Sequence, residues 1–318
     1  MTTIEISDVR YPPLLRNIPD PPTILHVEGA LEPMDSLAVA IVGSRHATLY
    51  GIRVARMLAE ELSLLGFTIV SGMARGIDRV AHEGALASGG RTLAVLGCGL
   101  DVAYPSGHTE LRAQVAAAGA VLTEFPLGSP PLAANFPRRN RILSGLSLGV
   151  VVVEAAEGSG SLITARLAAE QGREVFAVPG LIDAPTSRGT HALLKQGAKL
   201  TETVDDILEE LLPQIQRQPC DKSAAGTSSC DGGQSLARPS ADSSVRLGTH
   251  PPRRAHKEPV LSSDEQRVYA AVTREPRSID EVTDQSSLTS SVVACALLAL
   301  ELKDAIRQTP GRRYYRSR

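Results

Sequence analysis

Between residues 37 and 178 of this 318-residue chain, short apolar runs alternate with segments of helical character. Strands that are buried on both faces of a parallel sheet have near-continuous apolar sequences, and crossover helices separate them along the chain. The pattern therefore predicts a Rossmann-like α/β fold with a doubly wound, mainly parallel sheet. The expected strands are Leu37–Val42, Thr68–Val70, Thr92–Leu96, Val121–Phe125, Leu148–Val153 and Val175–Val178.

Changes in composition divide the chain into four predicted parts. Residues 1–36 are rich in Pro and are expected to form an extended packing arm, and residues 37–212 hold the predicted sheet. Residues 213–258 are polar and rich in Ser, Gly and Ala, which favours a disordered linker. Residues 259–318 predict three helices and a terminal hairpin with a Pro-Gly turn. This is the arrangement of a small winged helix-turn-helix domain.

Composition also excludes several classes of protein. The chain has no run of about 18 apolar residues, so no membrane-spanning helix is expected. Its first residues lack the basic start and apolar run of a secretory signal. The four cysteines form no C-x-x-C pair, which indicates neither a metal site nor a disulfide framework. We therefore expect a cytoplasmic protein that uses no metal and no cofactor.

The net charge of −2 hides an asymmetry between the two parts of the chain. Residues 1–212 hold 17 Lys and Arg against 23 Asp and Glu, whereas residues 213–318 hold 16 against 12. Since the larger part is acidic, any site for a polyanion must be local there. It would be built from a few Arg side chains and backbone N–H groups.

Glycine-containing loops follow several of the predicted strands. Ligands of open parallel sheets sit beyond the carboxyl ends of the strands, and helix N-termini offer free N–H groups and a partial positive charge. Three of the loops, all except Gly97–Asp101, lead into an expected helix, and with Arg45 and Arg75 nearby they predict a phosphate-binding rim. For any single loop, a tight strand-to-helix turn is an equally good explanation. The loops are Gly43–Thr48, Ser71–Gly76, Gly97–Asp101 and Gly158–Ser161.

A further motif, Phe136-Pro137-Arg138-Arg139-Asn140-Arg141, combines an aromatic ring with three arginines and an amide. Guanidinium groups pair with phosphates, and a phenyl ring can stack on a nucleobase. The motif therefore suits a sugar-phosphate chain. The alternative is a solvated basic turn with Phe136 in the core.

Enzyme signatures are weak in this sequence. The Gly97-x-Gly99 pair lacks the third glycine of a dinucleotide fingerprint, and no phosphate-binding P-loop string occurs. Ser159 and Ser161 are not in a G-x-S-x-G elbow. Asp78 and His82 lie one turn apart, where a local hydrogen bond is more plausible than a metal pair.

The loops, in this order, resemble the DNA-processing protein A family (DprA, also called Smf). The resemblance covers roughly residues 10–212 and, weakly, 260–318. The matching strings are IVGSRHATLYG at 41–51, SGMARGIDRVAHEGAL at 71–86, TLAVLGCGLDVAYP at 92–105, TEFPLG at 123–128, FPRRNRILSGLS at 136–147, VVVEAAEGSGSLITARLAAEQGREVFAVPG at 151–180 and GTHALLKQGA at 189–198.

This resemblance implies a homodimeric protein, not an enzyme, that binds single-stranded DNA, protects incoming DNA and loads the RecA recombinase during natural transformation. It leaves open which of two adjacent arginines, Arg138 and Arg139, faces DNA. The DNA-binding residues that it implies are Gly43, Ser44, Arg45, Ser71, Gly72, Arg75, Phe136, Arg138, Arg139, Asn140, Arg141, Ser159, Gly160, Ser161 and Thr164.

The chain also departs from the family pattern. Many members carry an N-terminal helical domain that resembles a sterile-alpha-motif fold, for which the residues before the first predicted strand are too few. His108 and His191 stand where the family often has Asn. The expected recognition helix, Leu288–Glu301, holds no Lys or Arg, so we do not expect this module to read base edges.

Two other functions compete with this prediction. One is a nucleotide-derivative hydrolase of the lysine-decarboxylase-like type, which would need a P-G-G-x-G-T loop where this chain has Gly158-Ser159-Gly160-Ser161. The other is a transcription factor that acts through the winged helix, which the uncharged recognition helix disfavours.

Overall fold

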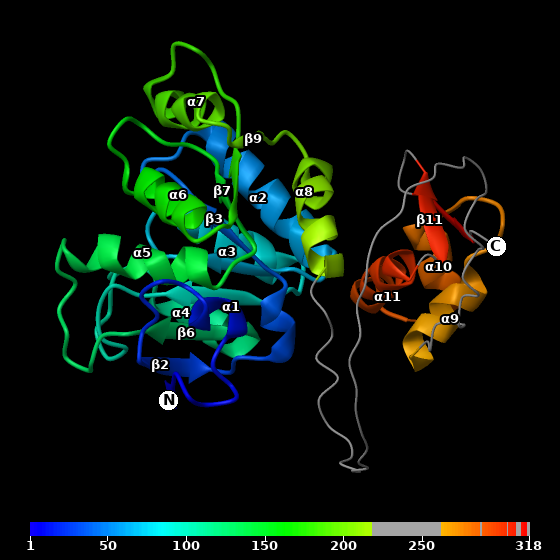
Figure 1. Ribbon diagram of the computed structural model, residues 1–318, viewed down its shortest axis with the longest axis horizontal. Helices are drawn as coiled ribbons and strands as arrows, with labels where there is room; N and C mark the ends of the chain where they lie inside the picture. Colours follow the sequence, from blue (N-terminus) through cyan, green and yellow to red (C-terminus); the bar gives the residue numbers. More distant parts are fainter. Residues whose placement is uncertain (218–261, 287, 304, 310–312, 317–318) are drawn as a thin grey trace, which may run out of the picture.

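The computed structural model describes residues 1–217, 262–286, 288–303, 305–309 and 313–316. Its main body is built on a nine-stranded sheet with the order β1-β2-β6-β5-β4-β3-β7-β8-β9 (Figure 1). The strands β6, β5, β4, β3, β7, β8 and β9 are neighbours in this order and run parallel, and β1 and β2 add an antiparallel edge beside β6. The predicted Rossmann-like class is confirmed. The strands are β1 Thr2–Glu5, β2 Ile24–Gly29, β3 Ala38–Val42, β4 Thr68–Ser71, β5 Thr92–Val95, β6 Ala120–Thr123, β7 Gly149–Val152, β8 Glu174–Ala177 and β9 Lys199–Leu200.

The order of the strands reverses at β3, which lies between β4 and β7. At such a switch point the chain leaves neighbouring strands toward opposite faces of the sheet and opens a crevice beyond their carboxyl ends. The topology therefore places a crevice at the ends of β3 and β7.

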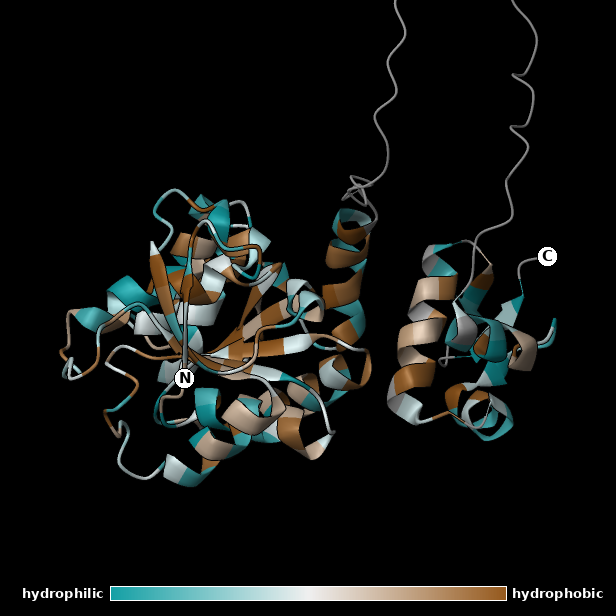
Figure 2. Cartoon of the chain, turned by 90° about the horizontal axis from the view of Figure 1, so that it is seen from below, coloured by the Kyte–Doolittle hydropathy of each residue, from teal (hydrophilic) through white to brown (hydrophobic). Residues whose placement is uncertain are grey.

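Helices cover both faces of the sheet because the strand side chains on both faces are apolar. Alternate residues of β3 show this, since Val39 and Ile41 belong to the core on one face and Ala40 and Val42 to the core on the other. Figure 2 shows apolar residues concentrated in the central strands. Helices α2 Leu49–Leu64, α3 Ile77–Ala87, α4 Thr109–Ala118 and α8 Val204–Arg217 pack on the first face, and α1 Pro13–Arg16, α5 Asn135–Gly145, α6 Gly160–Glu170 and α7 Arg188–Lys195 on the second. Two short 3₁₀ turns, Pro33–Ser36 and Pro185–Ser187, complete this body.

The first 36 residues differ from the expected extended arm. They contribute β1, α1 and β2, and β2 pairs with β6, so they form an edge of the sheet. Leu25 and Val27 alternate with more exposed residues and are buried in the core. Tyr11 is also buried, and its hydroxyl donates to Pro22 O at 2.7 Å. Burial of these side chains stabilises β1 and β2, which the Pro-rich sequence did not predict.

The C-terminal residues form the predicted winged helix. Its three-stranded sheet has the order β10-β12-β11 and packs on a small core that includes Val268, Leu297 and Ile306. The elements are α9 Ser263–Ala271, β10 Arg277–Ser278, α10 Ile279–Ser286, α11 Ser290–Leu302, β11 Ile306–Thr309 and β12 Arg313–Arg316.

The predicted linker at residues 213–258 falls mostly outside the described residues, although α8 extends through Arg217, past its expected start. Among the described residues, no helix has both the length and the apolar character needed to cross a bilayer.

Candidate functional site

A cleft of about 670 Å³ opens at the carboxyl ends of β3 and β7, where the topology places a crevice. We call it the strand-end cleft. Three segments that are far apart in sequence line it: the loop after β3, the first turns of α5, and the start of α6. Ten of the fifteen predicted site residues line it, namely Gly43, Ser44, Arg45, Phe136, Arg139, Asn140, Ser159, Gly160, Ser161 and Thr164.

Buried polar contacts hold the loop after β3 in place. The backbone N–H of Thr48 donates to Glu154 Oε2 at 2.9 Å, and the Thr48 hydroxyl donates to Glu154 Oε1 at 2.5 Å. Ser44 O accepts from the N–H of Ile77 at 3.1 Å. A Cβ at Gly76, whose φ is 76°, would lie 2.2 Å from that same Ser44 oxygen. Only glycine therefore allows the loops after β3 and β4 to meet here.

Arg45 carries an exposed positive charge at the mouth of the cleft. Its guanidinium carbon lies 5.4 Å from the ring centroid of Phe136, and it forms no ion pair with any residue that the structure describes. Phe136 is only partly buried, so it is not the core residue of the alternative interpretation. A half-exposed ring beside an unpaired guanidinium can bind a base and a phosphate together.

The start of α6 forms the opposite wall of the cleft. Ser159 caps this helix, and its hydroxyl accepts from the N–H of Ser161 at 3.4 Å. The Asn140 side-chain amide donates to Gly160 O at 3.2 Å and ties α5 to α6. The first N–H groups of a helix have no partner within it, so this end offers hydrogen-bond donors and a partial positive charge to an anion.

Arg139 lies beneath the cleft with 4% of its surface exposed. Its Nη1 donates to Val95 O and, at 2.9 Å, to Gly72 O. Burial lowers the pKa of Arg139 to about 10, so the guanidinium stays charged at neutral pH. Arg139 therefore ties the loop after β4 to the end of β5.

Asp78 is the acidic group that interacts most strongly with this buried charge. Burial raises the pKa of Asp78, and the guanidinium of Arg139 opposes that rise. Ala74 N donates to Asp78 Oδ2 at 3.3 Å, whereas His82 Nδ1 lies 2.7 Å from Thr92 Oγ1. Asp78 and His82 thus have separate partners, and the hydrogen bond expected between them is not formed.

The remaining predicted residues lie outside the lining. Ser71 is buried and its hydroxyl donates to Ile41 O at 2.7 Å, while Gly72 is buried against Arg139 and Asp78. Arg75 is exposed on the loop after β4. Arg141 donates to both Glu124 oxygens at 2.7 and 2.8 Å. The Arg138 side chain is 62% exposed and lies 3.3 Å from Glu124.

Other residues of the cleft were not among the predicted ones. Tyr104 lies beside Phe136 with 5.4 Å between ring centroids and an interplanar angle of 44°. Its position after the Gly97–Asp101 loop was the available signal, since that loop also follows a parallel strand. Asp78 and Glu157 bring acidic groups to the lining. Within the described ranges, no group of three or more His, Cys, Asp or Glu side chains is placed to hold a metal ion.

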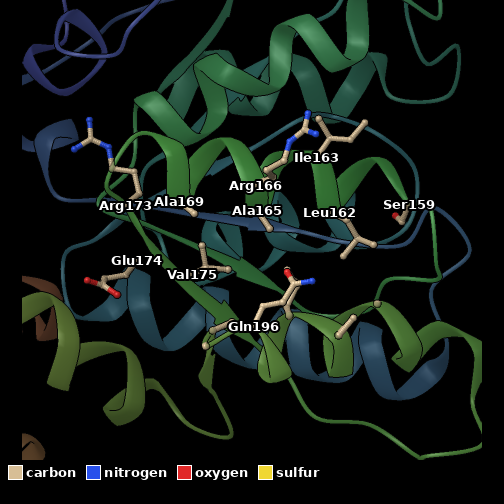
Figure 3. A pocket seen from close by; sticks show the side chains of 16 residues that line it. Ser159, Leu162, Ile163, Ala165, Arg166, Ala169, Arg173, Glu174, Val175 and Gln196 are labelled. Carbon is tan, nitrogen blue, oxygen red and sulfur yellow. The ribbon is translucent and has the colours of Figure 1, made fainter.

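A second hollow, of about 730 Å³, lies between α6 and α7. Its walls are largely apolar, and Figure 3 shows Val175 and Gln196 directed into the space between the two helices. It shares only Gly158 and Ser159 with the strand-end cleft. Figure 3 shows Arg173 and Glu174 at one end of this hollow and Arg166 directed away from it. Since its charged groups do not converge, the strand-end cleft is the better candidate for a charged ligand.

Comparisons with known proteins identify the family to which both parts of the chain are similar. The family model described as "DNA recombination-mediator protein A" matches residues 2–212, and that of the "DprA winged helix domain" matches residues 251–312. "Protein Smf" of Escherichia coli is 55% identical over 202 residues, which are 63% of this chain and 54% of that protein. The chain thus spans about half the length of that relative.

Two solved structures resemble the main body. One is DNA processing protein A (DprA) from Streptococcus pneumoniae, with a TM-score of 0.63 and 43% identity over 66% of this chain and 74% of that one. The other is DNA processing protein A from Helicobacter pylori, with a TM-score of 0.60 and 32% identity over 67% of this chain and 96% of that one. The published description of the second concerns its single-stranded DNA binding mode.

Proposed function

Because this chain belongs to the DNA recombination-mediator protein A family, we propose that it binds single-stranded DNA in the strand-end cleft. The observation that supports this most directly is the convergence of Arg45, Phe136 and the start of α6 on one cleft. These groups match the two parts of an unpaired strand, since cations and N–H groups suit phosphates and an aromatic ring suits bases. The Helicobacter relative, described by its single-stranded DNA binding mode, adds support.

Each wall of the cleft takes a distinct part in this proposal. A phosphate would lie between the Arg45 guanidinium and the partially positive N-terminal end of α6. The adjoining base would stack on Phe136, whose other neighbour is Tyr104. Arg139 and Glu154 would not touch DNA, since they hold the loops that present these groups. The cleft discriminates against duplex DNA because paired bases are stacked inside the helix and cannot reach an aromatic ring.

We further propose that the protein acts as a binding protein and not as an enzyme. The serines at the start of α6 hydrogen-bond to each other at 2.8 Å, and none of the described histidines lines the cleft to serve as their base. The competing hydrolase would also need the P-G-G-x-G-T loop, which this sequence lacks.

The winged helix has a different role in this proposal. Helix α11 has no Lys or Arg, and Val293 and Leu297 commit part of it to the small core. Arg316, one of the basic residues after it, donates to Tyr269 O at 2.7 Å and is thereby held in the fold. We propose that this module, joined to the main body through a linker after α8, does not read base edges and adds protein contact or weak backbone affinity.

The family membership also underlies the wider role. We propose a cytoplasmic homodimer that protects incoming single strands and loads the RecA recombinase onto them during natural transformation. A RecA ATPase assay on DNA covered with single-strand-binding protein tests this role. The full chain should shorten the lag before ATP hydrolysis, and a lag that stays unchanged at saturating protein would contradict it.

Fluorescence anisotropy with the full chain tests the binding proposal. A labelled oligo-dT and a duplex of the same length should be compared across a range of salt concentrations. We expect tighter binding to the single strand and an affinity that falls steeply with salt, because phosphate contacts release counterions. Equal affinity for duplex and single strand, or no binding of either, would argue against the strand-end cleft as a site for unpaired DNA.

A further inference from the structure

A smaller hollow of about 240 Å³ adjoins the strand-end cleft, and we call it the side hollow. It lies between the loop after β5, the loop after β4 and the first turns of α4. Tyr104 lines both hollows, so they share one wall. Pockets for whole drug-sized ligands start at about 300 Å³. The side hollow therefore suits one flat ring, or a similar fragment of a larger ligand.

His108 brings an unused hydrogen-bond acceptor to the side hollow. Only 6% of its surface is exposed, and its Nδ1 lies 3.0 Å from Met73 O. Because a carbonyl oxygen only accepts, Nδ1 carries the proton there, and Nε2 of the neutral ring is an acceptor. Nε2 has no hydrogen-bond partner among the residues that the structure describes. A ring nitrogen that makes no hydrogen bond to the described residues, on a side chain that lines a hollow, is free to accept from a ligand with an N–H donor.

The charge at the side hollow is already balanced. Arg112 donates to Glu28 Oε2 at 2.6 and 3.1 Å and also to Leu100 O. Its guanidinium is therefore committed, and among the described residues no other Lys or Arg lines the hollow. This arrangement disfavours a phosphate and favours a neutral, planar group.

Aromatic contacts connect the two hollows. The Arg45 guanidinium lies 5.4 Å from the Phe136 ring centroid, and Phe136 lies 5.4 Å from the Tyr104 ring centroid. Tyr104 then borders the side hollow. Single strands commonly follow such rows of rings, because every base has a face that can stack.

We propose that the side hollow binds one nucleobase of a single strand, next to the nucleotide held at Arg45, with an N–H of the base donating to His108 Nε2. This inference rests on the proposed function. Each of the four bases has at least one N–H donor on its pairing edge, so the subsite accepts any base while admitting only an unpaired one. It extends the contact surface beyond the cleft to a second nucleotide.

A filling substitution tests the subsite without disturbing the core. Ala113 lines the side hollow from α4 and is exposed. A Phe there leans toward the N-terminus of its helix, over Thr109, which lines the same hollow. The matched control is Gln114→Phe, because Gln114 is an exposed neighbour outside the lining. Oligo-dT affinity should fall about tenfold for Ala113→Phe, within the range for one stacked base, and stay unchanged for Gln114→Phe.

The two hypotheses fail in different ways in this experiment. If wild-type protein binds oligo-dT, Arg45→Ala weakens binding and Ala113→Phe does not, then the subsite is wrong and the proposed function stands. If wild-type protein does not bind oligo-dT, the proposed function itself is wrong, and the subsite with it.

A chemical variant of the ligand tests the hydrogen bond to His108. Oligo-dT methylated at N3 of each thymine keeps its stacking face but lacks the N–H donor. Wild-type protein should bind it several-fold more weakly than ordinary oligo-dT. His108→Leu, checked for native circular dichroism, should bind both oligonucleotides alike. Equal discrimination by the two proteins would overturn the role of His108.

Discussion

Arg45 and Arg139 line the same cleft, but they differ in exposure and in the partners of their guanidinium groups. Arg45 is exposed, rests on the face of Phe136 and forms no ion pair with the described residues. Arg139 is buried, and its Nη1 donates to two backbone carbonyls, Gly72 O in the loop after β4 and Val95 O at the end of β5. The guanidinium group itself therefore does not identify a ligand contact. A guanidinium group is a candidate ligand contact when its N–H donors are not used by other groups of the protein.

The comparison explains how an acidic body can present a site for a polyanion. The cations that hold the loops are paired or buried, as Arg141 is with Glu124, and they add little to the outer field. The free charge is concentrated at the mouth of the cleft, where Arg45 lies beside the start of α6. Local geometry, rather than net charge, determines the potential that a ligand meets.

Substitution of Arg139 by Met should have the largest effect and should act on stability. It removes two donors from backbone carbonyls and takes away the nearest positive charge from the buried Asp78. We expect the free energy of unfolding to fall by about 3–5 kcal/mol, as for other buried charges that lose their partner. Urea denaturation followed by circular dichroism measures it. A loss below about 1 kcal/mol, the range of surface ion pairs, would remove the distinction between the two arginines.

The pH dependence of the same variant gives an internal control. Without Arg139, the pKa of Asp78 rises further above its unfolded value, so the folded state binds a proton that the unfolded state releases. The free energy of unfolding of the variant therefore falls as the pH rises from the unfolded pKa of Asp78 toward its raised folded pKa. The stability deficit, meaning the difference between wild type and variant, should shrink as the pH falls toward the ordinary aspartate value. The double variant Arg139→Met, Asp78→Asn should show no such pH dependence of the deficit.

Substitution of Arg45 by Ala should reverse this pattern, with a large effect on binding and none on the fold. The affinity for oligo-dT should fall roughly ten- to a hundredfold, because a charge-assisted hydrogen bond to phosphate is lost. The free energy of unfolding should stay within about 0.5 kcal/mol of wild type, as for most surface positions. Arg53→Ala is the matched control, since Arg53 is exposed on the next helix and does not line the cleft. If both variants bind alike, Arg45 has no special role.

Arg138 should be intermediate between the two. Its side chain is 62% exposed and lies 3.3 Å from Glu124, at the end of α5 that carries Phe136. We expect Arg138→Ala to weaken oligo-dT binding about two- to fivefold, with less than about 1 kcal/mol lost in stability. Anisotropy and urea titrations on the same preparation measure both. A binding loss as large as that of Arg45→Ala would move the main phosphate contact to α5.

The sequence predicted the parallel sheet well and its antiparallel edge poorly, for a physical reason. Strands such as β3 and β7 are buried on both faces, so they appear as continuous apolar runs. Strand β2 lies near the edge and alternates, and its partner β6 is about a hundred residues away. Such long-range pairing leaves no local signal, and the prolines nearby favoured an irregular arm.

The cleft was predictable in part for a similar reason. Loops at the ends of parallel strands must meet at one edge, so glycine loops were sufficient to find them. Helical periodicity could also have separated the two adjacent arginines, because Arg139 lies three, four and seven positions before the apolar Ile142, Leu143 and Leu146. Arg138 has this spacing to Ile142 alone. Tyr104 was missed because its contact with Phe136 joins residues about 30 positions apart.

The smallest of the predicted effects is on the salt dependence of binding. It separates the two arginines because only a residue that contacts a phosphate should change that dependence. Each phosphate neutralised on a single strand contributes about −0.7 to the slope of log affinity against log salt. Arg45→Ala should therefore make the slope shallower by about 0.7, in anisotropy titrations at four or more salt concentrations. Arg139→Lys keeps a buried charge that touches no phosphate, so any change in its affinity should leave the slope at the wild-type value. A shallower slope for Arg139→Lys would mean that this guanidinium reaches DNA, and an unchanged slope for Arg45→Ala would mean that the exposed one does not.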